Sequence, residues 1–280
     1  MCSSDLWAFE RGKDWIAPFY RSIATCLTFG MSARDIMTAQ YATASDPSSG
    51  GRQMPGHYGS HEHNIVSVSS PVATQLLHAV GIALAAKIRK TGQVAMTSMG
   101  EGSSNQGDVH EGLNFAAIQK LPLVLMIENN GYAISVPLEK QVGGLSVAAR
   151  AKGYGFPGVT VDGGDVLGCY AAGKEAHERA RTGGGATLIE ARVVRLTSHS
   201  SDDDQRRYRD PAEVESLKQH DPRGLFADEL RTLGVLTDEV DERLRAEVKQ
   251  EVNEASKRAE ARPDPDPATA GRFVYAEEGH

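Results

Sequence analysis

The sequence predicts an α/β fold, in which a mostly parallel sheet has helices on both faces and a helical C-terminal extension follows it. The main observation is that short apolar runs alternate with helical patterns between residues 93 and 194. Strands connected through helices lie parallel, and such sheets are covered on both faces. A glycine-rich turn follows one expected strand and an Asn-Gly turn follows the next. These turns are where a ligand of such a sheet is expected.

Two helices and a long loop are expected before the first βαβ unit. Apolar residues recur at helical spacing over residues 14–29, which predicts a helix that ends at Gly30. Residues 45–63 are rich in Gly, Pro, Ser and His, which is typical of an ordered functional loop. A second apolar stripe predicts a helix from residue 71 to about residue 90.

The predicted sheet and the C-terminal extension come next. We expect strands at residues 93–98, 123–127, 159–161 and 187–194, with helices at 108–119 and 165–181, the latter with Asp165 as its N-cap. After a charged stretch over 195–210, Asp210-Pro211 predicts the start of another helix. A last long helix is expected over 237–261, before the sequence PDPDP. This pattern favours a single α/β domain over 1–262 with a tail over 263–280.

Composition excludes several classes of protein. The chain has 280 residues, a formal net charge of −7, and no apolar run near the roughly 18 residues that a membrane span needs. The negative charge disfavours nonspecific binding to nucleic acid. Cys2, Cys26 and Cys169 are far apart and form no CxxC pair, which argues against a disulfide framework or a zinc site and favours a reducing compartment. The first residues do not have the pattern of a targeting signal.

Polar residues follow two successive strands. Gly100-Glu101-Gly102-Ser103-Ser104 comes after the first, and Glu128-Asn129-Asn130-Gly131-Tyr132 after the second. A carboxylate and an amide oxygen at neighbouring strand ends, with a backbone carbonyl nearby, suit Mg²⁺, which takes six oxygens and shares some with phosphate. Each turn alone is a weak signal. The first is not spaced as the GxGxxG of a nicotinamide site, and the second alone is compatible with an ordinary turn.

Together the two turns resemble the thiamine-diphosphate motif, in which an acidic residue between glycines and a distant Asn bind the metal. The resemblance covers residues 20–275 and is to the alpha subunits of 2-oxo acid dehydrogenases, with the branched-chain (2-oxoisovalerate) group most similar. Five motifs occur in the family order: GRQMPGHYGS at 51–60, SSPVATQ at 69–75, GEGSSNQGDVHEGLNFAA at 100–117, ENNGYAISVP at 128–137 and SHSSDDDQRRYR at 198–209. The resemblance implies a thiamine-diphosphate-binding fold.

The resemblance also implies cofactors and the residues that hold them. Mg²⁺ would be bound by Glu101, Asn130 and the backbone carbonyl of Tyr132, and thiamine diphosphate would lie against the first turn through Gly100, Gly102 and Ser103. Tyr20 and Arg21 would contact the diphosphate, and Ser70 and Val72 would line the aminopyrimidine and thiazolium rings. Ser69, Thr74 and Gln75 match a potassium site of some branched-chain members. Without the resemblance, SSPVAT at 69–74 reads as a helix start, the side-chain oxygens of Ser69, Thr74 and Gln75 read as helix caps, and the Tyr-Arg pair reads as a surface helix face.

His199 matches the active-site histidine of the family and would give a hydrogen bond or a proton to the substrate or intermediate. The alternative is a solvated histidine, one of nine in the chain. Glu101 replaces the Asp that is commoner in the family, although some branched-chain members share it. Family members usually carry several dozen residues before the stretch matching residue 14, so a truncated N-terminus is one interpretation of this start.

The implied reaction is oxidative decarboxylation of a branched-chain 2-oxo acid, with acyl transfer to a lipoyl group of a partner acyltransferase. The activating glutamate of the family comes from a beta subunit, so an α₂β₂ assembly is expected. The location would be the cytoplasm of a bacterium or the mitochondrial matrix of a eukaryote. Two alternatives stay open: a pyruvate or acetoin dehydrogenase alpha subunit, and a noncatalytic scaffold subunit that binds Mg²⁺ and phosphate.

Overall fold

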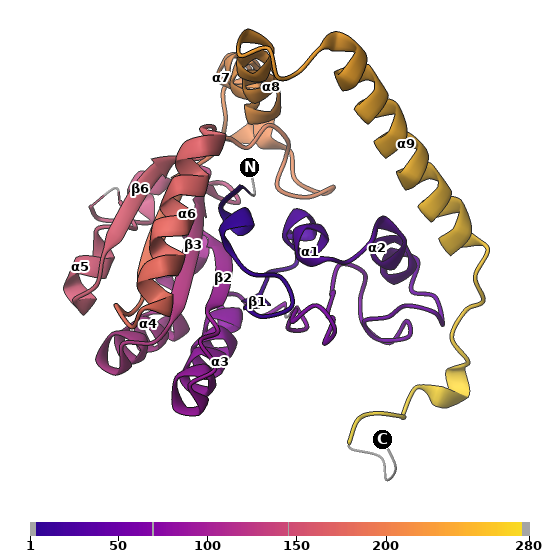
Figure 1. Ribbon diagram of the computed structural model, residues 1–280. Coiled ribbons are helices and arrows are strands. Elements are labelled where there is room, and N and C mark those ends of the chain that lie inside the picture. Colours follow the sequence, from indigo (N-terminus) through magenta and orange to yellow (C-terminus); the bar gives the residue numbers. More distant parts are fainter. Residues whose placement is uncertain (1–3, 69, 145, 276–280) are drawn as a thin grey trace.

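A parallel sheet forms the centre of the molecule (Figure 1). The computed structural model describes residues 4–68, 70–144 and 146–275. Within these residues the main sheet has five strands in the order β1-β2-β3-β7-β6, and every neighbouring pair is parallel. The strands are β1 (Trp15–Ala17), β2 (Ala95–Gly100), β3 (Leu123–Asn129), β6 (Gly158–Asp162) and β7 (Thr187–Arg192). The predicted parallel α/β architecture is confirmed.

Helices cover both faces of the sheet (Figure 1). One hydrophobic core joins the sheet to α3 (Thr74–Arg89), α4 (Gly107–Gln119) and α5 (Arg150–Tyr154). The other core joins it to α1 (Ile23–Phe29), α2 (Ala33–Gln40) and α6 (Val166–Arg181). Strand β3 shows how one sequence serves both cores, because Leu123, Leu125 and Ile127 face the first core while Val124 and Met126 face the second.

The predicted helix over residues 14–29 is wrong in its first half. Trp15–Ala17 is strand β1 instead, and it pairs with β2 at the sheet edge. Pro18 follows at once, and a proline does not fit inside a helix because it lacks an N–H and clashes with the preceding turn. The carboxylate of Asp14 accepts hydrogen bonds from the backbone N–H of Glu10 and Val94, which holds the start of β1 in place. The helix end at Gly30 is confirmed, with φ +126° at that glycine.

Two helices after the sheet begin within one residue of their predicted starts. Asp210 accepts from the N–H of Ala212 at the start of α7 (Pro211–Leu217), and Thr237 accepts from that of Val240 at the start of α9 (Asp238–Glu260). Between them lies α8 (Pro222–Thr232), which the sequence did not predict. Helix α9 packs on α2. No helix in the described residues is long and apolar enough to span a membrane.

The remaining elements are short. A hairpin of β4 (Tyr132–Ala133) and β5 (Val136–Pro137) follows β3. Single 3₁₀ turns occur at Ser4–Ala8, Glu101–Asn105, Leu138–Lys140, Gln205–Arg207, Lys218–His220 and Pro267–Thr269. The segment after α9 lies against the loop after α2, because Ala44 donates its N–H to the Pro263 carbonyl and Arg52 donates to Thr269 Oγ1 at 3.1 Å.

Candidate functional site

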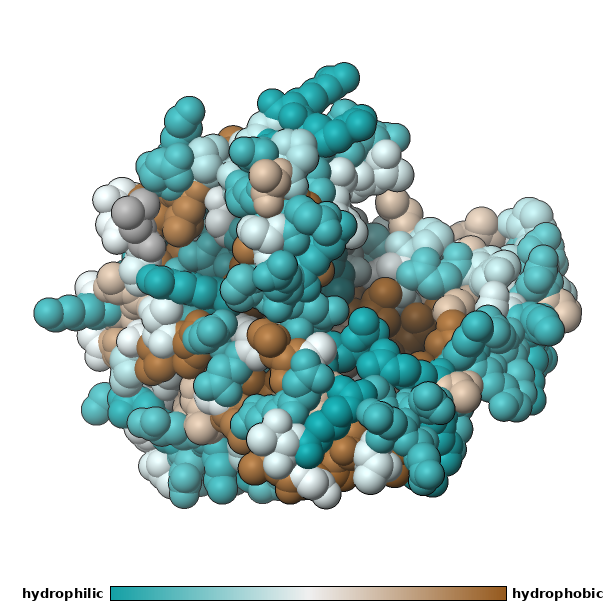
Figure 2. All heavy atoms as spheres, turned by 90° about the horizontal axis from the view of Figure 1, so that it is seen from above, coloured by the Kyte–Doolittle hydropathy of each residue, from teal (hydrophilic) through white to brown (hydrophobic). Residues whose placement is uncertain are grey.

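A cavity of about 470 Å³ opens at the carboxyl ends of β2, β3 and β7. Figure 2 looks down on this side of the molecule and shows a hollow with apolar side chains at its base and hydrophilic ones around it. Most of the predicted site residues line the cavity: Tyr20, Arg21, Val72, Gln75, Gly100, Glu101, Gly102, Ser103, Asn130, Tyr132 and His199. Ser70 and Thr74 are not among the lining residues, and Ser69 lies outside the described residues. The structure therefore brings together segments that are up to 179 positions apart in the sequence.

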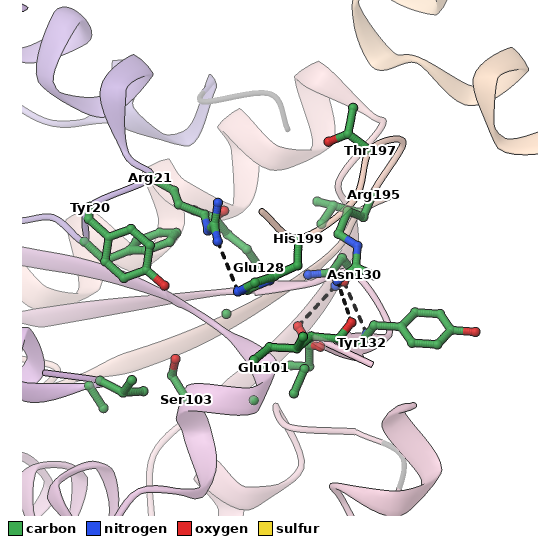
Figure 3. Close-up of a pocket in the computed structure, with 18 of the residues that line it drawn as sticks. Tyr20, Arg21, Glu101, Ser103, Glu128, Asn130, Tyr132, Arg195, Thr197 and His199 are labelled. Carbon is green, nitrogen blue, oxygen red and sulfur yellow. Dashed lines mark hydrogen bonds between the residues drawn. The ribbon is translucent and has the colours of Figure 1, made fainter. Parts of the chain in front are cut away.

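The two predicted metal-binding turns meet at the floor of this cavity (Figure 3). Strands β2 and β3 pair Gly100 with Glu128, so the turns that follow them begin side by side. Glu101 Oε2 accepts a hydrogen bond from the backbone N–H of Asn130 at 3.3 Å. Asn130 Oδ1 in turn accepts from the N–H of Tyr132 at 3.2 Å. The acidic oxygen of the first turn thus contacts the second turn directly.

The other carboxylate oxygen of Glu101 lacks a partner. Glu101 is only 1% exposed, and its Oε1 makes no hydrogen bond within the described residues. Gln141 Oε1, near the same turn, is also buried without a donor. Burial raises the pKa of the Glu101 carboxyl above its ordinary value. An orphaned carboxylate oxygen of a residue that lines the cavity fits a cation, which would satisfy it.

Two glycines let the turns approach each other. A Cβ on Gly102 would lie 2.6 Å from the Cβ of Ala133, too close for any side chain. Gly131 has φ +83°, which only glycine adopts without strain, and it lets the chain reverse into the β4–β5 hairpin. Gly100 has open space around its Cβ position and lines the cavity. The glycine pattern therefore serves contact between the turns as well as access to the cavity.

His199 enters the cavity from the loop after β7 and meets Arg21 from the opposite wall (Figure 3). Arg21 Nη2 lies 3.1 Å from His199 Nε2. Because a guanidinium only donates, Nε2 must accept, and the imidazole is neutral with its proton on Nδ1. Burial, Arg21 and Arg195 lower the pKa of His199. Asp203 Oδ2 accepts a hydrogen bond from the backbone N–H of His199 at 2.8 Å, which fixes the loop locally.

Two charged residues of the cavity, Arg195 and Glu128, were not predicted as site residues. Arg195 donates to the Ile134 carbonyl at 2.8 Å and lies over the ring of Tyr132, with Cζ 5.6 Å from the centroid. Glu128 also lines the cavity, and its pKa is raised to about 8 by burial and by the nearby acids Asp5 and Glu101. The signal for both was their position, since each lies at or just beyond the end of a predicted strand.

Two of the three residues proposed for potassium, Thr74 and Gln75, have partners within the described residues. Thr74 Oγ1 donates to Asp108 Oδ2 at 3.4 Å, and Gln75 Nε2 donates to the Ser98 carbonyl at 3.1 Å. Gln75 is buried and lines the cavity. Ser70 Oγ lies 2.6 Å from His57 Nε2. That contact joins the predicted functional loop over 45–63 to the start of α3.

A protein-family model described as the dehydrogenase E1 component matches residues 5–268. The chain belongs to this family. It is 52% identical over 270 residues to a 2-oxoisovalerate dehydrogenase subunit alpha of Bacillus subtilis (strain 168), a match covering 96% of this chain and 82% of that protein. It is 38% identical over 267 residues to a 3-methyl-2-oxobutanoate dehydrogenase subunit alpha of Mycobacterium tuberculosis, covering 95% and 70%.

A mitochondrial 2-oxoisovalerate dehydrogenase subunit alpha of Mus musculus is 40% identical over 271 residues, and the match covers 96% of this chain but 61% of that longer protein. The resemblance to alpha subunits of the branched-chain group, inferred from five motifs, is thus confirmed at the level of the whole sequence. The E1 family match agrees with the parallel α/β sheet that the structure shows.

Proposed function

We propose that this chain is the alpha subunit of a thiamine-diphosphate-dependent dehydrogenase that decarboxylates branched-chain 2-oxo acids of the 2-oxoisovalerate type. The observation that carries the proposal is the cavity in which the turns of Glu101 and Asn130 meet below Arg21 and His199. The names of the similar proteins support it, since they are alpha subunits of 2-oxoisovalerate or 3-methyl-2-oxobutanoate dehydrogenases. None of the relatives reported above is named for pyruvate or acetoin.

The residues of the cavity suit Mg²⁺ and a diphosphate. Glu101, Asn130 Oδ1 and the carbonyl of Tyr132 would hold the metal, and the unpartnered Oε1 of Glu101 is the acceptor that such an ion needs. Tyr20 and Arg21 would contact the diphosphate from the opposite wall. When bound, thiamine diphosphate supplies the carbon nucleophile and accepts the electrons released with CO₂.

Other residues would hold the aminopyrimidine and thiazolium rings of the cofactor. Val72 is 48% exposed at the cavity wall and would pack as an apolar wedge against them, with Ser70 beside it at the start of α3. A potassium ion bound by Ser69, Thr74 and Gln75 would stabilise this same helix start. Gly100, Gly102 and Ser103 would place backbone atoms against the diphosphate.

His199 would act on the substrate. In its neutral form it can donate from Nδ1 or exchange a proton near neutral pH. Arg21 holds the Nε2 side of the ring at 3.1 Å, and Asp203 holds the backbone at 2.8 Å, so the imidazole is positioned before any substrate arrives. Its work would be to bind the substrate carboxylate or oxo group and to move a proton there.

This chain would form half of an active site. A beta subunit would supply the glutamate that activates the cofactor, in an α₂β₂ assembly, and a lipoyl-bearing acyltransferase would receive the acyl group. We further propose a reducing location, the cytoplasm of a bacterium or the mitochondrial matrix of a eukaryote. The buried free thiol of Cys26 is compatible with it.

The test is turnover by the assembled enzyme. The full chain, mixed with a beta subunit of this family, thiamine diphosphate and Mg²⁺, should release CO₂ from 2-oxoisovalerate with kcat/KM at least about 10-fold above that for pyruvate or 2-oxobutanoate. Absence of CO₂ release from all three acids would refute the proposal. His199→Ala and Glu101→Ala should abolish turnover, whereas His78→Ala, on an exposed part of α3, should not. A scaffold role would be supported if all variants behaved alike.

A further inference from the structure

A buried carboxylate lies directly behind the metal-binding turns. Glu190 is on β7, next to β3 in the sheet, and is fully buried. Within the described residues it forms no ion pair with a Lys, Arg or His, and three hydrogen bonds stabilise the carboxylate instead. Oε1 accepts from Asn129 Nδ2 at 2.7 Å, and Oε2 accepts from Ser146 Oγ at 3.0 Å and from the N–H of Ala148 at 2.8 Å. A buried acid that is bonded only by neutral donors is costly, and a local task would explain its presence.

Asn129 connects Glu190 to the second metal-binding turn. Its Nδ2 donates to Glu190, which leaves Oδ1 to accept from the N–H of Gly131 at 3.0 Å. That second bond closes the turn around Asn130, whose own Oδ1 points into the cavity region (Figure 3). Glu190 thus decides which end of the Asn129 amide faces the turn.

The segment 146–150 connects the same acid to the first metal-binding turn. Its Ser146 and Ala148 donate to Glu190, and four residues after Ser146 its Arg150 donates from Nη1 to the Ser104 carbonyl at 2.8 Å and from Nη2 to Asn105 Oδ1 at 2.7 Å. Ser104 Oγ in turn donates to the carbonyl of Glu101 at 2.6 Å. One short segment therefore holds both turns through hydrogen bonds.

We propose that Glu190 is a positioning residue for the metal and diphosphate site, and that it acts through Asn129 and the 146–150 segment to fix the turns of Glu101 and Asn130 relative to each other. The proposal rests on the proposed function, since it assumes that these turns bind a metal. Ligand oxygens must be placed within a few tenths of an ångström for Mg²⁺, which demands near-octahedral geometry. Partners one layer behind metal ligands typically affect affinity by 10- to 100-fold.

Glu190→Gln is the sharpest test because it changes one oxygen to NH₂ at nearly constant shape. The new amide has one acceptor oxygen, while the three donors around it approach from two sides. If its NH₂ faces Ala148, two N–H groups oppose each other and the 146–150 segment loses its anchor. If its NH₂ faces Asn129, that amide must turn over and present NH₂ to the N–H of Gly131. Either way the connection between the turns is broken.

A second substitution should restore the connection. In the double variant Asn129→Asp/Glu190→Gln, the new carboxylate accepts both from the N–H of Gly131 and from the new amide, whose oxygen accepts from Ser146 and Ala148. Every hydrogen bond is then present again with donor and acceptor exchanged between the two side chains. Asn129→Asp alone places two carboxylates against each other and should not restore anything.

The experiment measures Mn²⁺ binding to the full chain assembled with a beta subunit of this family, with thiamine diphosphate present, by electron paramagnetic resonance, well below the melting temperature of every variant. We expect Glu190→Gln to weaken Mn²⁺ binding about 10- to 100-fold, and the double variant to recover most of that loss. Ile189→Val, in the core next to Glu190, should lower the melting temperature without changing Mn²⁺ affinity. Arg150→Met, at a half-buried position that should tolerate the change, should also weaken binding.

The outcomes separate this proposal from the proposed function. If wild type binds Mn²⁺ and Glu101→Gln does not, but Glu190→Gln and Arg150→Met bind as wild type, the positioning role is refuted and the metal site stands. Failure of the double variant to recover binding would also overturn it. If wild type itself binds no Mn²⁺ with thiamine diphosphate, the proposed function fails first. If Glu190→Gln does not fold, Arg150→Met and the double variant decide.

Discussion

Glu101→Gln should show that the buried carboxylate lowers the stability of the protein without ligands and raises it when the metal is bound. The side chain is 1% exposed, and Oε1 has no hydrogen-bond partner in the described part of the chain. An unsatisfied buried polar atom costs about 1–3 kcal/mol, more when it is charged. An amide at this position keeps the shape, can still accept from the N–H of Asn130, and removes the buried charge. Without ligands the variant should therefore be as stable as wild type or more stable by about 1–2 kcal/mol.

With ligands the order should reverse. A ligand present at 100 times its dissociation constant adds about 2.7 kcal/mol to the free energy of unfolding. For a chain of this size, each kcal/mol raises the melting temperature by about 2–4 °C. Thiamine diphosphate with Mg²⁺ should thus raise the melting temperature of wild type by about 5–10 °C. An amide is a much weaker magnesium ligand than a carboxylate, so Glu101→Gln should lose most of this increase.

The measurement is thermal unfolding followed by circular dichroism, with Mg²⁺ alone, thiamine diphosphate alone and both together. Glu139→Gln is a suitable control, because this exposed carboxylate is not among the residues that line the cavity. The control should show the full increase that wild type shows. The reasoning is refuted if Glu101→Gln keeps the full increase with both ligands, because the ion would then be held elsewhere.

Three further outcomes are expected. Arg21→Met should raise the pKa of His199 toward its ordinary value, since the guanidinium is one of the groups that lower it. The pKa is measured by NMR titration, and the His199 signal is assigned by its loss in His199→Gln. An unchanged pKa would mean that the two side chains do not interact. Glu128→Gln should become more stable relative to wild type as pH rises from about 4.5 to about 8. Because the pKa of the Glu128 carboxyl is raised in the folded protein, its ionisation over this pH window lowers the free energy of unfolding of wild type but not of the variant. The gain should be about 1–2 kcal/mol because the cavity is open to solvent, and urea titrations at pH 5 and 9 that give equal differences would contradict it. Gly158→Ala should destabilise the chain by more than about 3 kcal/mol, because the added Cβ would lie 1.9 Å from the Ala148 carbonyl oxygen. A free energy of unfolding within about 0.5 kcal/mol of wild type, measured by chemical denaturation, would be inconsistent with this packing.

The parts of the fold that the sequence predicted are those with local causes. The N-cap roles of Asp165 and Asp210 depend on hydrogen bonds to residues two or three positions away, and both are confirmed. Strand β2 lies two residues later than predicted, at Ala95–Gly100, because its extent follows from pairing with β3 rather than from its own pattern. Strand β1 could not be read locally at all. Its three residues fit a helical stripe equally well, and only the edge of β2 makes them a strand.

The same distinction applies to the site. The turns after β2 and β3 were predicted because each carries its own signal in a few adjacent residues, Gly100–Gly102 and Asn129–Gly131. The role of Arg195 was not, because it depends on β7 lying beside β3, an order that no local pattern encodes. Glu190 was missed for a similar reason. In the sequence it is a single acid within an apolar strand, and only the fold places it behind Asn129.

The charges around the cavity have an order that links metal binding to protonation. Glu101 and Glu128 form an acidic floor, and Asp5 is buried near Glu128 outside the cavity lining. Burial raises the pKa of all three, for Asp5 to about 7 and for Glu128 to about 8. Arg21 and Arg195 lie across from them in the same cavity. A divalent ion on the floor would favour the ionised carboxylates and release protons, while the arginines would attract the diphosphate. Metal affinity should therefore rise with pH, and metal and diphosphate should bind cooperatively, since each offsets the charge that the other encounters.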